Sequence, residues 1–354
     1  MTVKRFAWAL VVAVGALGCG DSGGGGGSGG SSGYPNCPDC MHYQYVVGPM
    51  STSPNDHGIK VPGTNSEATA LGCDINGDNH VDNQLGTILV QLKALSSSFD
   101  VQASVDSSFM SGSIIILFDI EAKPSITNTT VAGAKSYLGA HDTSDGLQAP
   151  AFYMGNGKFT VTMAAGPGFA GKVTSGAASF GPGQLTVQFP LVMGQAPLVT
   201  DLIAATVSGT ISATNVSNAK LCGAIPADEI KTRILPQIAT LLSAQVKSGS
   251  QTGMTIKTLF DKNPTYPACA NDPLNTNCDT DPNCTSPTAP NPCTCITACE
   301  LENNSTIRTL LAPDLDLDPN KTNPFAMPGD PDYKNDALSV GLGFEANKAS
   351  FPAQ

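Results

Sequence analysis

The feature that most constrains the fold is a series of short segments in which apolar and polar residues alternate. This period of two is typical of a β-strand with one face buried. It occurs at 99–105, 159–163, 185–193, 198–213 and 338–344, while residues 114–120 are almost continuously apolar. Turns rich in Gly and Pro, at 155–157, 166–168 and 181–183, separate several of these segments. We therefore expect a mainly β fold, an antiparallel sheet or sandwich with a few packed helices, and α+β as the alternative.

Other segments repeat apolar residues at steps of three or four, which is the spacing of a helix face. They lie at 85–95, 230–242, 254–260 and 307–311. Pro226, followed by Asp228 and Glu229, is typical of a helix start, and Pro236 predicts a kink in the same helix. Residues 34–70 show little periodicity and are expected to be irregular. The pattern predicts β structure in the middle of the chain, with helices before and after it.

Residues 73–82 place oxygen-bearing groups at every second position of a short loop. The candidate ligands are the side chains of Asp74, Asn76, Asp78 and Asp82 and the backbone carbonyl of His80. Ca²⁺ takes six to eight oxygen ligands, and alternate positions of a tight loop can supply them. The alternative is an Asx-rich turn that caps the helix expected after it, with Asp82 or Asn83 as the capping residue.

This loop resembles the calcium loop of EF-hands and, more closely, that of dockerin repeats. The resemblance implies that Asp74, Asn76 and Asp78 are the ligands at the first, third and fifth positions. Asn79 stands where those loops carry Gly, and Leu85 stands where a bidentate carboxylate completes the shell. The implied site is therefore a weak structural calcium site, with a Kd of roughly 10⁻⁴–10⁻³ M.

A second acidic segment alternates carboxylates with apolar residues, at Asp314, Asp316 and Asp318. Asp330, Asp332 and Asp336 follow before the last expected strand. The segment is similar to the Asp-rich calcium repeats of thrombospondin-type modules, which implies a second Ca²⁺ site. The alternative is a solvated acidic loop.

The N-terminal residues show the pattern of an export signal. Lys4 and Arg5 precede an apolar run at 6–17, which is too short to span the roughly 30 Å hydrocarbon core of a bilayer. The run ends at Cys19 in a sequence, ALGC, that resembles the lipobox of bacterial lipoproteins. This resemblance implies acylation of Cys19 and a protein of the bacterial cell envelope, facing the periplasm or the exterior. An ordinary secretory signal is the alternative.

The rest of the chain divides by composition. After the signal at 1–19, residues 20–33 are almost entirely Gly and Ser and are expected to be a flexible tether. Residues 34–354 are expected to form a single β-rich domain, with the Asp-rich loop at 74–82 and a disulfide-rich insertion at 262–300.

Ten cysteines remain after Cys19, an even number that favours disulfides in an exported protein. Four lie in the body of the chain and six crowd into an almost apolar-free insertion: Cys37, Cys40, Cys73 and Cys222, then Cys269, Cys278, Cys284, Cys293, Cys295 and Cys299. We expect the first four to pair among themselves and the insertion to be held by its own bridges. The alternatives are a redox or zinc role for Cys37 and Cys40, and zinc in the insertion.

The net charge of the chain and a search for catalytic motifs narrow the classes of function that the sequence suggests. The formal net charge is −11, which disfavours nucleic acid as a partner. We find no nucleophile elbow, phosphate loop or HExxH motif, so no catalytic residue is predicted and the protein is not expected to be an enzyme. The leading hypothesis is a lipid-anchored, calcium-stabilised binding, adhesion or structural module, with a protein or glycan partner. A carrier of lipid or another hydrophobic ligand is the alternative, followed by an extracytoplasmic hydrolase.

Overall fold

The computed structural model describes residues 37–352, except for 96–99, 190–197, 248–250, 261–295 and the single positions 38, 52, 54, 55, 165, 319, 327 and 332. The signal, Cys19, the tether and most of the Cys-rich insertion lie outside the described residues. Ten strands form one sheet in which all neighbouring strands are antiparallel. They are β1 (Met41–Val47), β2 (Ile59–Lys60), β3 (Ile116–Ser125), β4 (Asn128–His141), β5 (Phe159–Ala164), β6 (Phe169–Thr174), β7 (Ala177–Phe189), β8 (Leu198–Ile211), β9 (Asn215–Pro226) and β10 (Ala337–Lys348).

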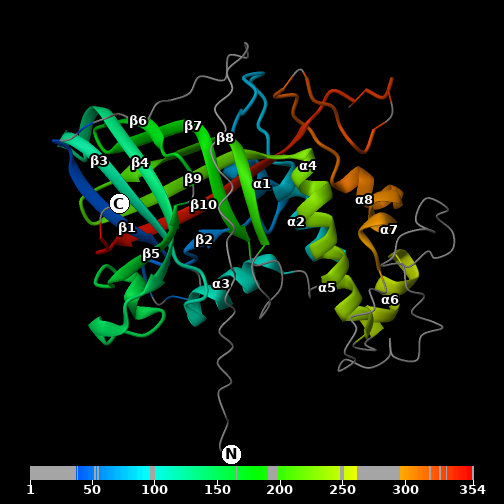
Figure 1. Ribbon diagram of the computed structural model, residues 1–354, viewed down its shortest axis with the longest axis horizontal. Helices are drawn as coiled ribbons and strands as arrows, with labels where there is room; N and C mark the ends of the chain where they lie inside the picture. The colour runs from blue at the N-terminus through cyan, green and yellow to red at the C-terminus, as the bar shows by residue number, and fades with distance from the viewer. Residues whose placement is uncertain are drawn as a thin grey trace, which may run out of the picture. The chain divides into compact units, whose positions relative to one another are not determined.

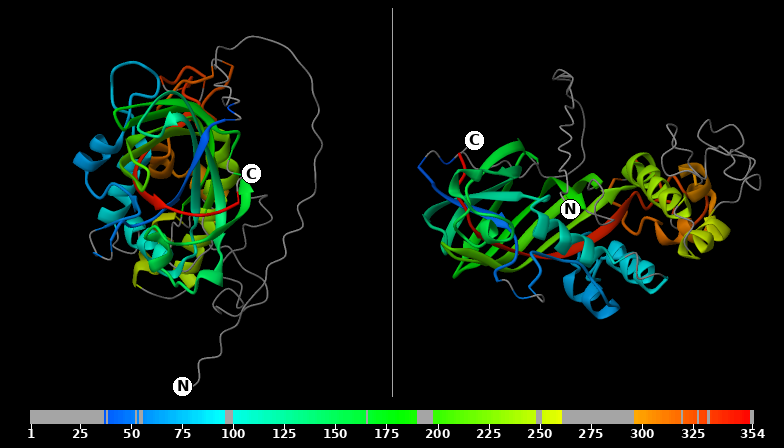
Figure 2. Two further views of the ribbon diagram at one scale, coloured as in Figure 1. Left: turned by 90° about the vertical axis from the view of Figure 1, so that its left-hand side faces the viewer. Right: turned by 90° about the horizontal axis from the view of Figure 1, so that it is seen from below.

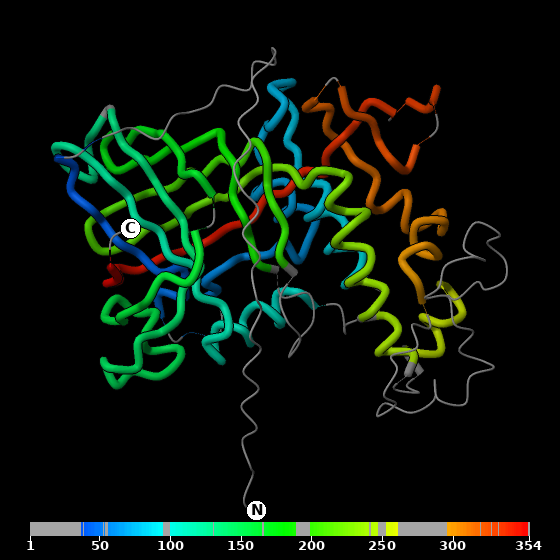
Figure 3. Tube along the Cα trace, viewed as in Figure 1, coloured from blue at the N-terminus to red at the C-terminus, as the bar shows by residue number. Residues whose placement is uncertain are grey.

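The sheet is closed on itself. Its strands follow the order β1-β3-β4-β6-β7-β8-β9-β10, and β10 then pairs with β1 through Tyr45 opposite Lys348 and Val47 opposite Ala346. The tube in Figure 3 shows the blue first strand beside the red last strand, and the left view of Figure 2 looks along the surrounded interior. The antiparallel sheet expected from the sequence is confirmed, and the strand expected at 338–344 does close it.

Side chains fill the interior of the closed sheet. The cavity left among Phe118, Phe180 and Phe344 and their small neighbours measures about 20 Å³. The aromatic planes of Phe118 and Phe344 stack with their centroids 5.5 Å apart. A cavity of this size holds roughly one water molecule, whereas pockets for small-molecule ligands measure roughly 300–1,000 Å³. This cavity is therefore much smaller than a ligand pocket.

Helices pack beside the sheet in two groups (Figure 1). The first group contains α1 (Asn65–Leu71), α2 (Gln84–Leu95) and α3 (Val101–Ser111). The second contains α4 (Ala227–Glu229), α5 (Leu235–Lys247), α6 (Gln251–Phe260), α7 (Ala298–Asn303) and α8 (Ser305–Leu310). A π-type turn at Ile230–Ile234 joins α4 to α5 just before Pro236, the residue expected to disturb this helix. Among the described helices, none combines the length and the apolar character needed to cross a membrane.

Two sequence predictions are wrong. Residues 99–105 were expected to be a strand, but α3 begins at Val101, capped by Asp100 and ended by Gly112 in the left-handed conformation. Its buried residues Val101, Val105 and Phe109 are four apart, a spacing that suits a helix face as well as a short alternation. Residues 34–70 were expected to be irregular, yet they contain β1, β2 and α1.

Two disulfides join the four body cysteines, as expected. Cys37 bonds to Cys40, and Cys73 bonds to Cys222 across 149 positions of the sequence. The second bond ties the start of the Asp-rich loop to β9. Cys299 is also disulfide-bonded, whereas the other cysteines of the insertion lie outside the described residues.

Candidate functional sites

The Asp-rich loop at 74–82 is closed by its own side chains. Asp74 accepts hydrogen bonds from the backbone N–H groups of Gly77 (2.7 Å) and Asn79 (2.9 Å), and Asn79 has the left-handed φ of 66° that its position in the resemblance requires. Asp78 accepts from the N–H of His80 (2.8 Å), which lowers the pKa of this exposed carboxyl. Asp74, Asn76 and Asp78 are exposed, so their remaining lone pairs face solvent.

Asp82, the last candidate ligand of the loop, is not directed to solvent as Asp74, Asn76 and Asp78 are. It is buried, its Oδ2 accepts from the N–H of Ile75 (2.8 Å), and its backbone forms a two-hydrogen-bond bridge with Cys73. Asp82 therefore closes the base of the loop. Asn83, the next residue, caps α2 by accepting from the N–H of Gly86 (3.0 Å), as the capping alternative predicted.

The second acidic segment uses its carboxylates to hold the start of β10. Asp314 accepts from the N–H (2.8 Å) and the hydroxyl (2.5 Å) of Ser339. Asp336 accepts from the N–H groups of Leu317 (2.8 Å) and Asp318 (3.1 Å). Burial raises the pKa of both Asp314 and Asp336. Of the three predicted ligands, Asp314 is thus directed inward, Asp318 caps the N–H of Asn320, and Asp316 is exposed.

The two acidic segments meet, although they are about 240 positions apart in the sequence. We call residues 73–82 and 314–318 together the Asp-rich corner. Ile75 of the loop and Leu317 of the second segment both pack against the buried cluster of Leu315, Ala224 and Ala337. The charge of Asp82 also contributes to the raised pKa of Asp314. Where the two segments meet, the negative charges of Asp82 and Asp314 therefore repel each other.

A polar groove of about 800 Å³ opens elsewhere, over β9 and β10. Its walls come from the described residues of the segment before β2, from β2 and α1, and from residues 218–220 of β9 and 343–345 of β10. Charged and titratable side chains from all of these elements line it: Asp56, His57, Lys60, Glu67, Lys220 and Glu345. The volume is in the range of ligand sites in proteins, and the lining suits a polar ligand.

Glu345 lies on β10 opposite a bulge in β9, where two residues, Ser217 and Asn218, stand against it. The pairing of β10 with β9 shifts register between Phe344 and Ala346, and the Glu345 N–H donates to Gly58 instead (3.0 Å). Such bulges redirect a side chain. Burial, the negative charge of Asp56 and a hydrogen bond with Asp56 raise the pKa of Glu345.

Neutralising Glu345 or Glu67, two carboxyls of this groove, should change the pH dependence of the free energy of unfolding in opposite directions. The folded chain binds the Glu345 proton more tightly than the unfolded chain, so ionisation of Glu345 costs stability as pH rises above its unfolded pKa of roughly 4.3. Glu345→Gln removes that cost. The free energy of unfolding of this variant, relative to the wild type, should therefore increase from pH 4 to pH 7 in urea titrations.

Glu67 supplies the matched control. The Gly63 N–H, with help from Lys60, lowers the pKa of Glu67, so its ionised form stabilises the fold, and this contribution is lost as pH falls. Glu67→Gln should accordingly lose stability relative to the wild type between pH 4 and pH 7. Parallel curves for the two variants would contradict the assigned environments.

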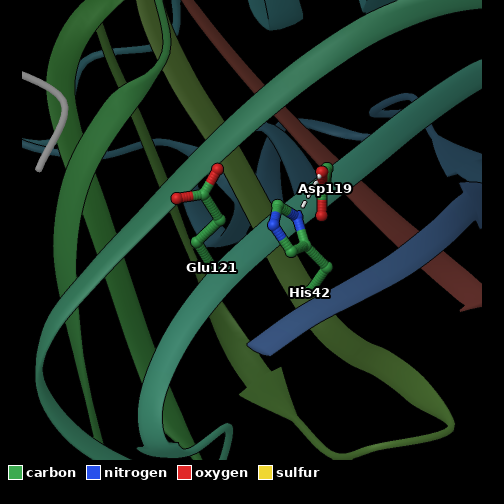
Figure 4. A group of neighbouring side chains, drawn as sticks. All are labelled: His42, Asp119 and Glu121. Carbon is green, nitrogen blue, oxygen red and sulfur yellow. Dashed lines mark hydrogen bonds and ion pairs between the residues drawn. The ribbon is translucent and has the colours of Figure 1, made fainter. Parts of the chain in front are cut away.

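A third group of titratable side chains lies on β1 and β3 (Figure 4). His42, Asp119 and Glu121 each offer a ligand atom within 4.8 Å of the other two, the one such group of three among the described residues. Nδ1 of His42 is 2.9 Å from Oδ2 of Asp119. Burial raises the pKa of Asp119. Burial and the charges of Asp119 and Glu121 raise the pKa of neighbouring Tyr137 to about 12.

Sequence reasoning found the Asp-rich loops because all the donors of each loop are close in sequence. It missed the groove and the His42 group, since these are assembled from residues as far apart as Asp56 and Glu345. The alternation of His42 with Tyr43 and Tyr45 within β1 was the one available signal, and it went unused. Comparison of the chain with protein-family models, curated proteins and solved structures finds no match.

Proposed function

We propose that this protein is a lipid-anchored binding module of the bacterial envelope, with a fold stabilised by Ca²⁺. The observation that carries the calcium part is the Asp-rich corner. There the exposed carboxylates of Asp74 and Asp78 belong to a loop whose backbone has the turn expected for a calcium loop. Ile75 of the loop and Leu317 of the second segment pack against the same buried cluster, which brings the two acidic segments together. Calcium would then stabilise the junction of the loop with the start of β10.

The polar groove is the binding surface in this proposal. It lies on the sheet itself, where Asp56, Glu345 and Lys220 present charges of both signs from β9, β10 and the segment before β2. A protein or glycan with hydrogen-bonding groups would suit such a lining. The lipobox and the Gly/Ser tether support display of this domain at a membrane surface through an acylated Cys19.

Calcium should raise the melting temperature of the full chain, purified in detergent with its disulfides intact. For a Kd of roughly 10⁻⁴–10⁻³ M, 10 mM Ca²⁺ should add about 1.4–2.7 kcal/mol to the free energy of unfolding. For a domain of this size, this corresponds to a rise of roughly 2–4 °C in melting temperature, measured by calorimetry against excess chelator.

Asp74→Ala and Asp78→Ala should each remove most of this calcium-dependent rise. Asp142→Ala is the control, because Asp142 is likewise a solvent-facing Asx-turn residue, accepting from the Ser144 N–H (3.0 Å), but lies outside the corner. An identical calcium response in the wild type and both loop variants would refute the calcium-stabilised module. Magnesium at the same concentration tests whether the rise is a general effect of divalent charge.

A further inference from the structure

The His42 group is built on one face of two paired strands. His42 on β1 is directly opposite Glu121 on β3, and Asp119 is two residues along β3, so the three side chains share a face. The His42 imidazole lies between the two carboxylates in Figure 4, with Nδ1 towards Asp119 and its other nitrogen on the side of Glu121. Nitrogen and carboxylate oxygen donors thus converge from a rigid part of the sheet.

Two buried polar atoms in this group lack partners among the described residues. Asp119 is 1% exposed, and while its Oδ2 meets His42, its Oδ1 has no hydrogen-bond partner. The hydroxyl of Tyr137, which is 3% exposed, is likewise unpartnered. Tyr137 on β4 is opposite Leu117 of β3, which puts its side chain on the same face as Asp119. Buried polar atoms are rarely left unsatisfied, so both point to a missing ligand.

In the other two His–Asp pairs of the described chain, the carboxylate has further hydrogen-bond donors. Asp145, which faces His141, also accepts from the N–H groups of Leu147 and Lys158 (2.9 Å each). Asp106, which faces His57, also accepts from the side chain of Gln102 (2.9 Å). Each has a donor other than histidine. Asp119 instead has an unpartnered oxygen and a second carboxylate nearby.

Lys135 lies beside this group. Its ammonium nitrogen is 3.7 Å from Oε1 of Glu121, a long ion pair, and its charge also acts on Asp119. His42 is 42% exposed at its side chain, so the group is open to solvent on one side. A cation can therefore reach it without a change in the sheet.

We propose that His42, Asp119 and Glu121 bind a divalent transition-metal ion, with Zn²⁺ the best match. Imidazole nitrogen with two carboxylates is a donor set suited to Zn²⁺ and poorly suited to Ca²⁺, which takes oxygen ligands. Donors at about 2.0–2.2 Å from tetrahedral Zn²⁺ lie roughly 3.3–3.5 Å apart, and the three ligand atoms here already lie within 4.8 Å of one another. Three protein ligands leave a fourth position for water, to which the Tyr137 hydroxyl can hydrogen-bond.

Isothermal titration of the untagged full chain with ZnCl₂ tests this site. The titration is made in detergent with 10 mM Ca²⁺ present. Calcium then fills any cation site in the Asp-rich corner, so that this corner does not contribute to the zinc signal. We expect one Zn²⁺ per chain with a micromolar or tighter Kd. His42→Ala and Glu121→Gln should each weaken binding at least tenfold. Both side chains reach solvent more than Asp119 does, so these variants are preferred over changes at Asp119.

Two controls separate this site from others. His57→Ala removes the half-exposed histidine of another His–Asp pair and should leave the Kd unchanged. Asp74→Ala should also leave it unchanged. Co²⁺ should give visible absorption bands typical of tetrahedral nitrogen and oxygen ligation, and these should be lost in His42→Ala. Absence of stoichiometric binding, or binding that survives both His42→Ala and Glu121→Gln, would overturn the assignment.

Discussion

Removal of the Cys73–Cys222 disulfide by a double substitution to Ala is expected to lower the free energy of unfolding by about 5 kcal/mol. The bond spans 149 positions, and its removal lets the unfolded chain recover the entropy of a very long loop. Cys73 begins the Asp-rich loop, while Cys222 lies in β9 opposite Gly341 of β10. The loss should therefore extend to the junction between the loop and the sheet. Guanidinium denaturation at fixed calcium measures it.

The Cys37–Cys40 bond is the natural comparison. It closes a loop of only a few residues at the start of β1, so its removal should cost about 2 kcal/mol on the same entropy argument. The two losses in free energy of unfolding should differ by roughly 3 kcal/mol. This difference depends less on the model chosen for the unfolded chain than either loss does. Equal losses would show that loop entropy does not govern these bonds.

Asn83→Asp is expected to destabilise the fold by about 3–5 kcal/mol, although the two side chains have nearly the same shape. Asn83 is buried and makes four hydrogen bonds. Its Nδ2 donates to the carbonyls of Ala68 (2.9 Å) and Gly341 (3.0 Å), while its Oδ1 accepts from the N–H groups of Gly86 (3.0 Å) and Gly341 (2.8 Å). A carboxylate would lose both donors and direct a charge at two buried carbonyls.

The side-chain amide of Asn83 joins α1, α2 and β10. We therefore expect Asn83→Asp to unfold in a single cooperative transition, at a lower denaturant concentration than the wild type. Asn65→Asp is the control. Asn65 is exposed at the first turn of α1, where a negative charge is compatible with the helix dipole, and the change should alter stability by less than about 0.5 kcal/mol. A loss below 1 kcal/mol for Asn83→Asp would contradict the role given to this network.

Local patterns predicted the strands whose alternation is long, such as β8 and β10, because a period of two sustained over many residues fits only a strand. They failed at α3, where Val101, Val105 and Phe109 satisfy both periods over a short window. The patterns also failed at β1. There, polar residues such as His42 and Gln44 occupy the face of the strand that carries the His42 group. Aromatic partners on the other face, including Tyr45, were too few to stand out.

The pairing of strands that are far apart in the sequence is a second feature that local patterns do not predict. Nothing in the spacing of β1 and β10 reveals that they join, because pairing between Tyr45 and Lys348 depends on the curvature of all the strands between them. The same holds for the candidate sites. The Asp-rich loop is encoded within ten residues and was predicted. The proximity of its acidic partner at 314–318 follows instead from the sheet and from the buried cluster against which Ile75 and Leu317 both pack.

The pairing of the first strand with the last has a consequence for how the protein is made. Until the residues of β10 have emerged from the ribosome, β1 and β9 both present unpaired edges, and such edges are prone to pair with other chains. Closure also depends on contacts of very large sequence separation, which form slowly. A growing chain that lacks β10 is therefore exposed to aggregation until its last strand is made.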